Sequence, residues 1–523
     1  MSIWLMYGTR SHRWDGIRLF DRPPVLAPPA WALTERTWQA TGLWPGERTA
    51  RGDAPDAIDV KTGVSPVESA QDQDQVPAQI PARIQAPVQN QDQAPVQIQA
   101  PVHDQTQAQL AAEVDRLIAA VPVGARRIAL VVPDGTRVGP WRELLPHLLM
   151  ALAAAFPRSR RTLLVASGVH AVLSAEALAR HLLPTDPGPS KALEAWAVTQ
   201  NGDNQFQGHI AVGRTPAGTP VRLHPAYMEA DWRILLGEIS WHYFAGFGGG
   251  RKLVFPGLAE PAGIAENHRR AIVLPEGVAS DPDGVGIEHV RWQERCGPGR
   301  LAGNPVHEDL EAAVALAPPH WVLTAVDEPP PDPDPARPKR FGFRVDQGPY
   351  PAAFAEAAEA FAHAHRVGFT AAPRVLLTDA GGRPRDTTFL QAHKSLQHGA
   401  RFVPRGGRLL LAAECADGLG SATLARFAAD PERFRPLAGM REDPLSVLHL
   451  QTLAALLSAV RVISVGLWSA LPASVVRALR MTPLASEEEA RAWAVAGGPT
   501  TWGWLPRAER FLPPAGFRGG ALR

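Results

Sequence analysis

Short apolar runs that suit buried strands alternate with longer apolar stretches that suit helices along much of the chain. Arg127–Pro133 predicts a strand, and Trp141–Phe156 predicts an apolar helix. Thr162–Ala166 predicts the next strand, Ser174 is placed to cap the helix after it, and Trp232–Gly237 predicts a third strand. Strands that alternate with helices indicate a mainly parallel sheet with helices on both faces.

The same alternation returns in the C-terminal half. Arg374–Thr378, Arg408–Ala412 and Arg461–Val465 predict strands, and a helix is expected from about Thr387 to Ala400. Two such regions predict an α/β protein with two domains, each with a mainly parallel sheet flanked by helices. Because ligands bind at the carboxyl ends of parallel strands and between domains, we expect the active site in the interdomain cleft.

Changes in composition divide the chain into segments. Residues 71–109 consist largely of Gln, Pro, Ala, Asp and Val, and such a tract buries too little apolar surface to offset its ordering entropy. A Pro/Asp-rich stretch at 326–340 is typical of a semi-rigid linker. The expected segments are an N-terminal segment at 1–70 that contributes strands to the first domain, a disordered insertion at 71–109, a first α/β domain at 110–325, the linker at 326–340, a second α/β domain at 341–480, and a tail at 481–523 that packs back on the first domain.

Composition also disfavours several classes of protein. The 523 residues include 53 Lys and Arg against 52 Asp and Glu, so no global field favours nucleic acid or an anionic membrane. The most apolar stretch, Ala454–Val476, is interrupted by Arg461 and Pro472 and predicts a buried helix followed by a strand. Cys296 and Cys415 have no CxxC spacing, which fits a reducing cytoplasm.

Lysine is scarce, since it supplies five of the 53 basic residues. Lys252 lies in a Gly-rich loop, and Lys394 follows a strand and a turn. An amine retained at such positions is a candidate nucleophile because, unlike a guanidinium, it can lose its proton. The alternative is that each is an ordinary surface lysine.

Chemically capable side chains follow the first two predicted strands. The first strand ends in Asp134-Gly135-Thr136-Arg137, whose Asp and Arg suit a ribose, a phosphate or a carboxylate. The second strand is followed by His170, a candidate acid/base group near neutral pH. The alternatives are an ordinary Asp-Gly turn and a capping or core histidine.

The third strand leads into the most informative segment, Gly237–Lys252, which contains His242. Its glycines allow backbone N–H groups to approach an anionic ligand, and Arg251 and Lys252 add positive charge. The segment is not a Walker A loop, because Arg251 precedes the lysine and Leu253 follows it, so an NTPase is disfavoured. The alternative is a flexible structural loop. The glycines concerned are Gly246, Gly248, Gly249 and Gly250.

Further candidates lie downstream. His268 has no cluster of Cys, His or carboxylate residues with metal-ligand spacing around it, so a metal there would need most of its ligands from elsewhere. His307 lies in a capped helix start, and we expect a structural role for it. Gln391 and Lys394 are three residues apart on a predicted helix, which places both on one face.

Taken together, these motifs resemble the nickel-pincer-nucleotide lactate racemase family. The order and spacing match over roughly residues 125–470, and Ala245–Lys252 is the most specific block. The motifs are Asp-x-Thr-Arg, Gly-x-His, His-x-Phe-Ala-Gly-Phe-x-Gly-Gly-Arg-Lys, Pro-Gly-x-Ala, Asn-His, and Gly-Gly-x-Pro-x-Asp with Gln-Ala-x-Lys.

The resemblance implies a cofactor and its ligands. The cofactor is a pyridinium-3,5-bisthiocarboxylic acid mononucleotide nickel complex, whose S, C and S atoms bind the metal. By position, Lys252 is its covalent tether and His268 is the fourth nickel ligand. The domain at 110–325 then becomes the cofactor-binding domain. Its other implied contacts are Asp134, Thr136, Gly248, Gly249, Gly250 and Arg251.

The resemblance also implies a reaction. A 2-hydroxy acid is racemised or epimerised by reversible hydride transfer to the cofactor through a planar 2-keto acid. His170 and His242 match the two acid/base groups, and Arg137 and Lys394 complete the catalytic set by holding the carboxylate and the keto oxygen, with Gln391 beside them. The implied partners are the small-molecule substrate and the proteins that make the cofactor and insert nickel, with no nucleic acid or membrane.

The chain departs from the family pattern at a few positions. Gly135, Ala171 and Leu390 stand where the family commonly has His, Arg and Tyr, and an aromatic residue expected near Leu448 is absent. We expect these changes to alter the pocket wall, which favours a 2-hydroxy acid other than lactate. Two alternatives are a non-catalytic cofactor carrier or sensor, and a nicotinamide-dependent dehydrogenase, although no GxGxxG motif follows a strand.

Overall fold

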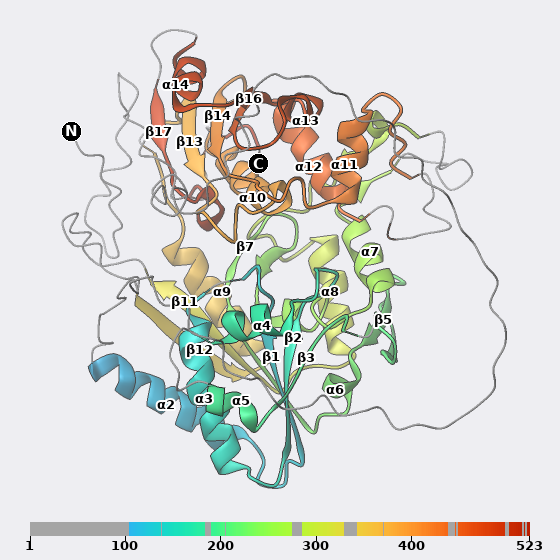
Figure 1. Cartoon of the computed structure of the whole chain (residues 1–523), viewed down its shortest axis with the longest axis vertical. Helices are drawn as coiled ribbons and strands as arrows, with labels where there is room; N and C mark the ends of the chain where they lie inside the picture. The colour runs from blue at the N-terminus through green and yellow to red at the C-terminus, as the bar shows by residue number, and fades with distance from the viewer. Residues whose placement is uncertain are drawn as a thin grey trace, which may run out of the picture.

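The structure, a computed structural model, describes residues 104–522 except 138, 184–189, 204, 275–284, 329–341, 370, 438–444, 446–447, 497–500, 515–516 and 518–519. The predictions for residues 1–70, and those for 71–103 of the insertion, lie outside the described residues. The helix α2 (Asp104–Ala120) already covers the end of the expected insertion. Two α/β units follow, and Figure 1 shows the first below and the second, in orange and red, above it.

The first unit is built on a six-stranded sheet. β1 pairs in parallel with β2 and β6, and β6 pairs in parallel with β11, while β12 is antiparallel to β11. The strand order is β12 (Gly342–Pro349), β11 (Trp321–Glu328), β6 (Trp232–Glu238), β1 (Arg127–Pro133), β2 (Arg160–Ala166) and β3 (Ala197–Gln200).

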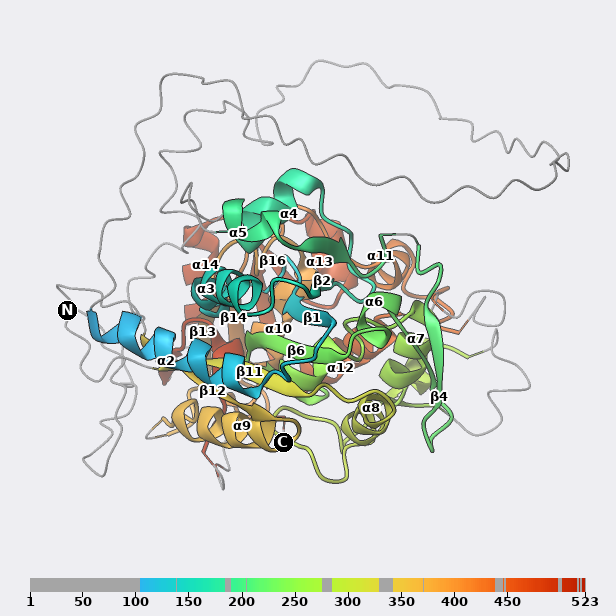
Figure 2. The same cartoon turned by 90° about the horizontal axis from the view of Figure 1, so that it is seen from below.

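Alternation along β1 explains how helices cover both faces of this sheet. Ile128, Leu130 and Val132 pack in one cluster with side chains of α2 and α3 (Trp141–Ala155). Ala129 and Val131 pack in another cluster, which contains side chains of α8 (Pro305–Ala315). Because successive strand residues point to opposite faces, an unbroken apolar run fills both cores. Figure 2 shows α3 and α8 on opposite sides of the central strands.

Shorter elements complete the first unit. Ser174 caps α4 as expected, since its hydroxyl accepts a hydrogen bond from the Ala177 N–H at 3.2 Å. These elements are α4 (Ala175–Leu182), α5 (Ser190–Glu194), the hairpin β4 (Ile210–Arg214) and β5 (Pro220–Leu223), α6 (Pro225–Met228), the hairpin β7 (Ser240–His242) and β8 (Gly246–Gly248), the 3₁₀ turn η2 (Gly250–Leu253), α7 (Pro261–Arg269), the pair β9 (Ile272–Val273) and β10 (Arg291–Trp292) with η3 (Ile287–His289) between them, and α9 (Ala352–Ala364).

The second unit has a five-stranded sheet in which every neighbouring pair is parallel. The expected α/β class with mainly parallel sheets flanked by helices is therefore confirmed. The strand order is β16 (Thr482–Leu484), β15 (Ser464–Trp468), β14 (Arg408–Ala412), β13 (Val375–Asp379) and β17 (Trp502–Trp504). The helices are α10 (Phe389–Gly399), α11 (Ala422–Ala429), α12 (Leu450–Val460), α13 (Ala473–Ala478) and α14 (Glu487–Val495), and η5 (Ala508–Arg510) follows β17.

The Pro/Asp-rich stretch at 326–340 does not connect the two units. It overlaps the end of β11 and leads into β12, and these two strands form an antiparallel pair from Trp321↔Pro349 to Glu328↔Gly342. The helix α9 then packs on the same strands, with Phe354 in one cluster with Val326. The first unit thus extends beyond the expected boundary at residue 341. Composition carries no information about which strands on either side of this stretch pair with each other.

The C-terminal tail also differs from the expectation that 481–523 packs back on the first domain. It supplies α14 to the second unit and the strands β16 and β17 to its sheet, where Val375 of β13 pairs with Trp502. Beyond β17, Leu512 packs in a cluster with Trp241 and Phe361 of the first unit. The tail is therefore chiefly part of the second unit and contacts the first near its end.

The apolar stretch at 454–476 forms much of the second core. The helix α12 ends at Val460 and β15 follows from Ser464, as the helix-then-strand prediction requires. Leu453 and Leu456 are fully buried. Among the described residues, no helix is long and apolar enough to cross a membrane.

Candidate active site

Two adjoining cavities contain most of the predicted site residues. We call the first the strand-end cavity; among the residues that line it are Asp134, His170, Gly248, Gly249, Lys252, His268 and His449. We call the second the arginine cavity; among the residues that line it are His242, Arg385, Gln391, Lys394, Arg507, Glu509 and Arg510. Arg137, Glu238 and Ser240 line both, so the two cavities share a wall.

The Gly-rich loop delivers Lys252 to the strand-end cavity. Gly249 has φ of 77°, and a Cβ there would lie 2.0 Å from the Glu238 carbonyl oxygen, so only glycine fits. The Lys252 Nζ lies 5.5 Å from the centre of the Phe244 ring. Burial, with the nearby charges of Arg251 and Arg137, holds the pKa of the Lys252 amine well below its usual value. The lowered pKa makes this amine easier to deprotonate, which favours its use as a nucleophile.

The structure does not place Arg251 or Gly250 at either cavity. Arg251 is fully buried; its Nε pairs with Glu311 at 2.7 Å and its Nη2 donates to His307 Nδ1 at 3.0 Å. A Cβ on Gly250 would lie 2.3 Å from the Phe354 ring, so this glycine serves close packing. Side chains of a 3₁₀ turn project about 120° apart, which separates the directions of Arg251 and Lys252.

His268 lies on α7 with both ring nitrogens buried and without a hydrogen-bond partner. Burial and the charge of Lys252 hold its pKa well below the usual value, so the ring is neutral. A neutral imidazole with unsatisfied nitrogens beside a cavity is suited to bind a metal or a ligand donor.

A buried network fixes the helix that carries His268. The Asp309 carboxylate on α8 accepts hydrogen bonds from Thr215 at 2.5 Å, Thr219 at 2.7 Å and Asn267 at 2.8 Å, and it pairs with Arg270 Nε at 3.1 Å. Asn267 and Arg270 lie on either side of His268 in the sequence, at the end of α7. Asp309 thereby positions His268 without touching the cavity.

Asp134 and His170 form a pair at the ends of β1 and β2. The His170 Nδ1 contacts Asp134 Oδ2, and the Thr136 hydroxyl donates to Asp134 Oδ1 at 2.8 Å. Burial raises the pKa of Asp134, but His170, Arg137 and the Thr136 hydroxyl outweigh burial and hold this pKa well below its usual range. Because an ionised carboxylate only accepts, Nδ1 of His170 carries a proton, and its Nε2 is left to accept one when the ring is neutral.

His242 is presented in a different way. Its Nδ1 accepts the Ala245 N–H at 3.3 Å, which assigns the proton of the neutral ring to Nε2. Its ring lies edge-on to Phe244 with 4.4 Å between centres. Burial and the charges of Lys252 and Arg137 hold the pKa of His242 well below its usual value.

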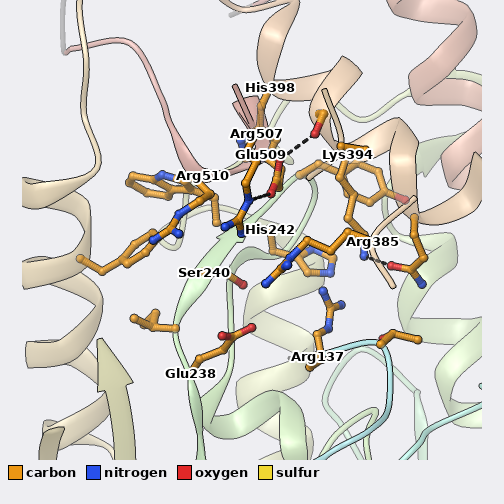
Figure 3. A pocket seen from close by; sticks show the side chains of 18 residues that line it. Arg137, Glu238, Ser240, His242, Arg385, Lys394, His398, Arg507, Glu509 and Arg510 are labelled. Carbon is orange, nitrogen blue, oxygen red and sulfur yellow. Dashed lines mark hydrogen bonds and ion pairs between the residues drawn. The ribbon is translucent and has the colours of Figure 1, made fainter. Parts of the chain in front are cut away.

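The helix α10 places Gln391 and Lys394 on one face, as predicted. The Lys394 Nζ donates to Gln391 Oε1 at 2.5 Å, and both side chains line the arginine cavity. Burial and the charge of Arg137 hold the pKa of Lys394 well below its usual value. Figure 3 shows Lys394 and Arg137 pointing into the same space beside His242.

Several cavity residues were not identified from the sequence. Arg385 lies within the Gly-Gly-x-Pro-x-Asp motif, and its place in that motif could have identified it as a site residue. Arg507, Glu509 and Arg510 come from the tail, more than 100 residues later in the sequence. His449 lines the strand-end cavity; burial and the charge of His170 lower its pKa to about 4.

The departures from the family pattern do not form the cavity walls. Gly135, Ala171, Leu390 and Leu448 line neither of the two cavities. Leu448 instead packs against the core that contains Ile264. The neighbouring residue in the chain, His449, lines the strand-end cavity.

Among the described residues, no three His, Cys, Asp or Glu side chains gather in a metal-binding group. Cys296 and Cys415 are both buried free thiols away from the two cavities. A metal bound at His268 would therefore take its remaining donors from a group other than these side chains.

Comparison with known families matches the part of the chain that supplies most of the strand-end cavity. The lactate racemase N-terminal domain matches residues 72–279. Lactate racemases from Thermoanaerobacterium thermosaccharolyticum and Lactiplantibacillus plantarum are each 26% identical, over 304 and 308 residues. The resemblance to the lactate racemase family is confirmed. The matches cover 58% and 57% of this chain, and 63% and 62% of the two lactate racemases, so the chain aligns with less than two thirds of either relative.

Solved structures extend the likeness to the fold of both units. The lactate racemase apoprotein from Thermoanaerobacterium thermosaccharolyticum superposes with a TM-score of 0.62 at 21% identity, covering 77% of this chain and 93% of that one. A Thermotoga maritima protein superposes with a TM-score of 0.55 at 14% identity, covering 78% of this chain and 98% of that one. At these identities the likeness concerns the fold.

Proposed function

We propose that this chain is an isomerase that racemises or epimerises a 2-hydroxy acid with a nickel-pincer nucleotide bound in the strand-end cavity. The observation that carries the proposal is His268, whose two buried, unsatisfied nitrogens lie at the same cavity as the amine of Lys252. The likeness to lactate racemases supports the reaction class. The proposal also names its partners, which are the substrate and the proteins that make and load the cofactor. The proposed location is the cytoplasm.

The residues of the strand-end cavity fit such a cofactor. Lys252 has a buried amine with a lowered pKa for covalent attachment to a thio-acid arm, and His268 has a free nitrogen for nickel. Gly248 and Gly249 both line the cavity, and Gly248 also packs closely on the paired strand, since a Cβ there would lie 2.6 Å from the Ser240 hydroxyl. When bound, the nickel-pincer nucleotide supplies an electrophilic carbon that takes the substrate's C2 hydrogen with its electron pair.

The substrate is held from the arginine cavity. Arg137 offers a bidentate fork to the carboxylate, and it lines both cavities, so an acid bound there reaches the cofactor side. Lys394, held by Gln391, is placed to donate to the oxygen on C2 as that carbon becomes a carbonyl. These contacts orient C2 before any bond changes.

The two histidines handle the hydroxyl proton. His170 accepts it at Nε2, while Asp134 holds Nδ1–H and stabilises the resulting cation. His242 serves the other enantiomer; to accept a proton at Nε2 its ring must carry the Nδ1 proton instead and release the Ala245 N–H. That hydrogen bond is long at 3.3 Å, so releasing it costs about 1 kcal/mol or less.

The test compares metal and mass in matched variants. The protein is co-expressed with the cofactor-making enzymes, and intact mass and nickel are measured for wild type, Lys252→Ala, His268→Ala and the control His147→Ala, whose side chain is exposed on α3. We expect one nucleotide-sized adduct and about one nickel in wild type and control. Lys252→Ala loses the adduct, and His268→Ala loses nickel. Absence of both nickel and nucleotide from wild type would refute the proposal.

A further inference from the structure

His449 is the residue through which the second unit reaches the strand-end cavity. The other residues that line this cavity lie between Pro133 and His268, in the first unit. His449 directly precedes α12, and α12 contacts α7, the helix that carries His268. Figure 1 shows α7 beneath α11 and α12. The second unit thus presents an imidazole to the proposed cofactor site.

The backbone at His449 adopts an uncommon conformation. Its φ of 71° and ψ of 8° lie in the left-handed region that favours glycine. The side chain makes no capping hydrogen bond to α12, so the start of the helix does not require an imidazole. The His449 carbonyl instead accepts the N–H groups of Thr452 at 2.9 Å and Leu453 at 3.2 Å. A large polar side chain at a strained position in a cavity wall indicates a role in binding a ligand.

Contacts from both units fix the position of this ring. Nδ1 of His449 lies 3.2 Å from the hydroxyl of Ser421, at the start of α11. In the first turn of α12, the Thr452 hydroxyl forms a hydrogen bond of 2.8 Å with the hydroxyl of Tyr243, in the turn of the β7–β8 hairpin. The imidazole is therefore oriented by α11, and the start of its own helix is tied to the first unit.

The contact with Ser421 also assigns the proton of the neutral ring. The Ser421 hydroxyl already accepts the Leu424 N–H at 3.3 Å, so its own proton is available to Nδ1 of His449. An imidazole that accepts at Nδ1 carries its proton at Nε2 when it is neutral. Burial and the charge of His170 lower the pKa of His449 to about 4, so the ring is neutral near pH 7. With Nδ1 turned to Ser421, the polar group that the ring offers to the cavity is Nε2–H.

His449 shares the cavity with the groups proposed to hold the cofactor. Lys252 and His268 line the same cavity. Burial lowers the pKa of His268, and the charges of Lys252 and His449 lower it further. The three side chains are therefore close enough to act on one bound molecule.

We propose that His449 is a cofactor-binding residue whose Nε2–H donates to the oxygen of the thio-acid arm that Lys252 does not take. This inference rests on the proposed function, in which one arm is joined to Lys252 and His268 binds nickel. The second arm keeps an anionic thiocarboxylate, whose sulfur binds the metal and whose oxygen accepts hydrogen bonds. Arg137 and His170 are assigned to the substrate, whereas His449 has no part in that reaction. Hydrogen bonds to an anion are stronger than those between neutral groups.

The experiment measures how firmly the loaded protein holds nickel. Wild type, His449→Phe and His449→Gln are co-expressed with the cofactor-making enzymes; phenylalanine keeps a ring without the donor, and glutamine keeps a side-chain N–H. Release of nickel to EDTA is followed by the absorption of the bound nickel complex, and intact mass reports the adduct. His449→Phe should release nickel about 10- to 100-fold faster and shift the absorption band, because it loses one charge-assisted hydrogen bond. His449→Gln should release it less than about tenfold faster.

Ser421→Ala provides a second arm that leaves His449 in place. The alanine removes the hydroxyl that orients the ring, together with a helix cap, so nickel release should become about 3- to 10-fold faster. Ser486→Ala is the matched control, because the Ser486 hydroxyl caps α14 by accepting the Glu489 N–H at 3.1 Å and lines neither cavity. Its release rate should equal that of wild type. Unfolding midpoints of the apoproteins establish that each variant is folded.

The outcomes separate this contact from the proposed function. Release at the wild-type rate from His449→Phe, or equally fast release from the phenylalanine and glutamine variants, would overturn the donor role and leave the racemase intact. Equal rates from Ser421→Ala and Ser486→Ala would overturn the assigned position of the proton. Faster release with an unchanged absorption band would move the contact to the nucleotide phosphate and overturn the assignment to the thio-acid arm. Wild type with neither nickel nor nucleotide would overturn the proposed function, and this inference with it.

Discussion

The strand-end cavity and the arginine cavity share a wall but are assembled in different ways. Every lining residue of the first lies between Pro133 and His268 except His449, so one α/β unit supplies nearly all of it. The second takes side chains from β7, α10 and the tail beyond β17, which belong to both units. One unit suffices to form most of the proposed cofactor site, whereas the proposed substrate site requires both.

The largest expected effect comes from the two proposed acid/base histidines, His170 at the strand-end cavity and His242 at the arginine cavity. His170→Ala and His242→Ala should each lower turnover about 10²- to 10⁴-fold, because each removes one proposed proton acceptor while the proposed nickel ligand, His268, stays in place. Nickel content and chiral assays of both enantiomers check this. Racemisation near the wild-type rate in either variant would refute the assignment of two bases.

Next in size is the support of the strand-end cavity by Asp309. Asp309→Ala leaves Arg270, Asn267 and two threonines without their shared acceptor, so the free energy of unfolding should fall by about 3–5 kcal/mol. Chemical denaturation measures it. The control Glu176→Ala breaks a surface ion pair with Arg180 and should cost under about 0.5 kcal/mol. Equal losses in both variants would contradict the role of Asp309.

A smaller effect is expected at the loop glycine. Gly249→Ala meets both a positive φ and the Glu238 carbonyl, so it should destabilise the protein by about 1–3 kcal/mol and lower adduct formation at Lys252. Gly208→Ala is the matched control, because Gly208 has φ of 81° with open space around its Cβ. If the two variants lose the same stability and both keep the adduct, the close approach of Gly249 to the Glu238 carbonyl does not contribute to function.

The smallest effect is a difference in pH dependence between Asp134 and Asp379, at the ends of β1 and β13. Burial raises the pKa of Asp379 to about 6, so the folded state binds the proton more tightly and its contribution to stability falls as pH rises from about 4 to about 6. Asp134 has a lowered pKa, so its contribution is present above pH 4 and lost as pH falls below it.

Thermal unfolding midpoints across pH 3–7 test this for wild type, Asp379→Asn and Asp134→Asn. The asparagine at 379 should flatten the curve between about pH 4 and pH 6, and the asparagine at 134 should flatten it below about pH 4. The same change of slope in both variants would contradict the assignment.

Local patterns in the sequence were sufficient for most of the elements. Arg127–Pro133 and Arg408–Ala412 are strands with the predicted bounds, because an unbroken apolar run in a parallel sheet is distinctive. The strand predicted from Arg461 begins at Ser464, since the preceding helix continues to Val460 and its closing turn uses the intervening residues. Which strands a loop connects depends on distant pairing, and for that reason the stretch at 326–340 was assigned wrongly.

The candidate site shows the same limit. Motif order was enough to select Lys252, His268 and His170, which the fold brings to one cavity. The cofactor contact assigned to Arg251 stays a prediction, because the 3₁₀ turn directs its side chain to Glu311 and His307, and the composition of the loop does not show this. Arg507 and Arg510 were missed because only the return of the tail to β13 brings them near the Gly-Gly turn.

Arg137 forms part of the wall between the two cavities, and its charge affects side chains in both cavities. Burial is the main cause of the lowered pKa values of Lys252 and Lys394, and the charge of Arg137 lowers both further. A carboxylate that neutralises Arg137 therefore raises the proton affinity of both amines. Because such couplings are reciprocal, a lysine that loses its charge in turn changes how tightly the anion binds. Occupancy of the proposed substrate site and the protonation of Lys252, the proposed cofactor tether, are thus thermodynamically linked through this guanidinium group.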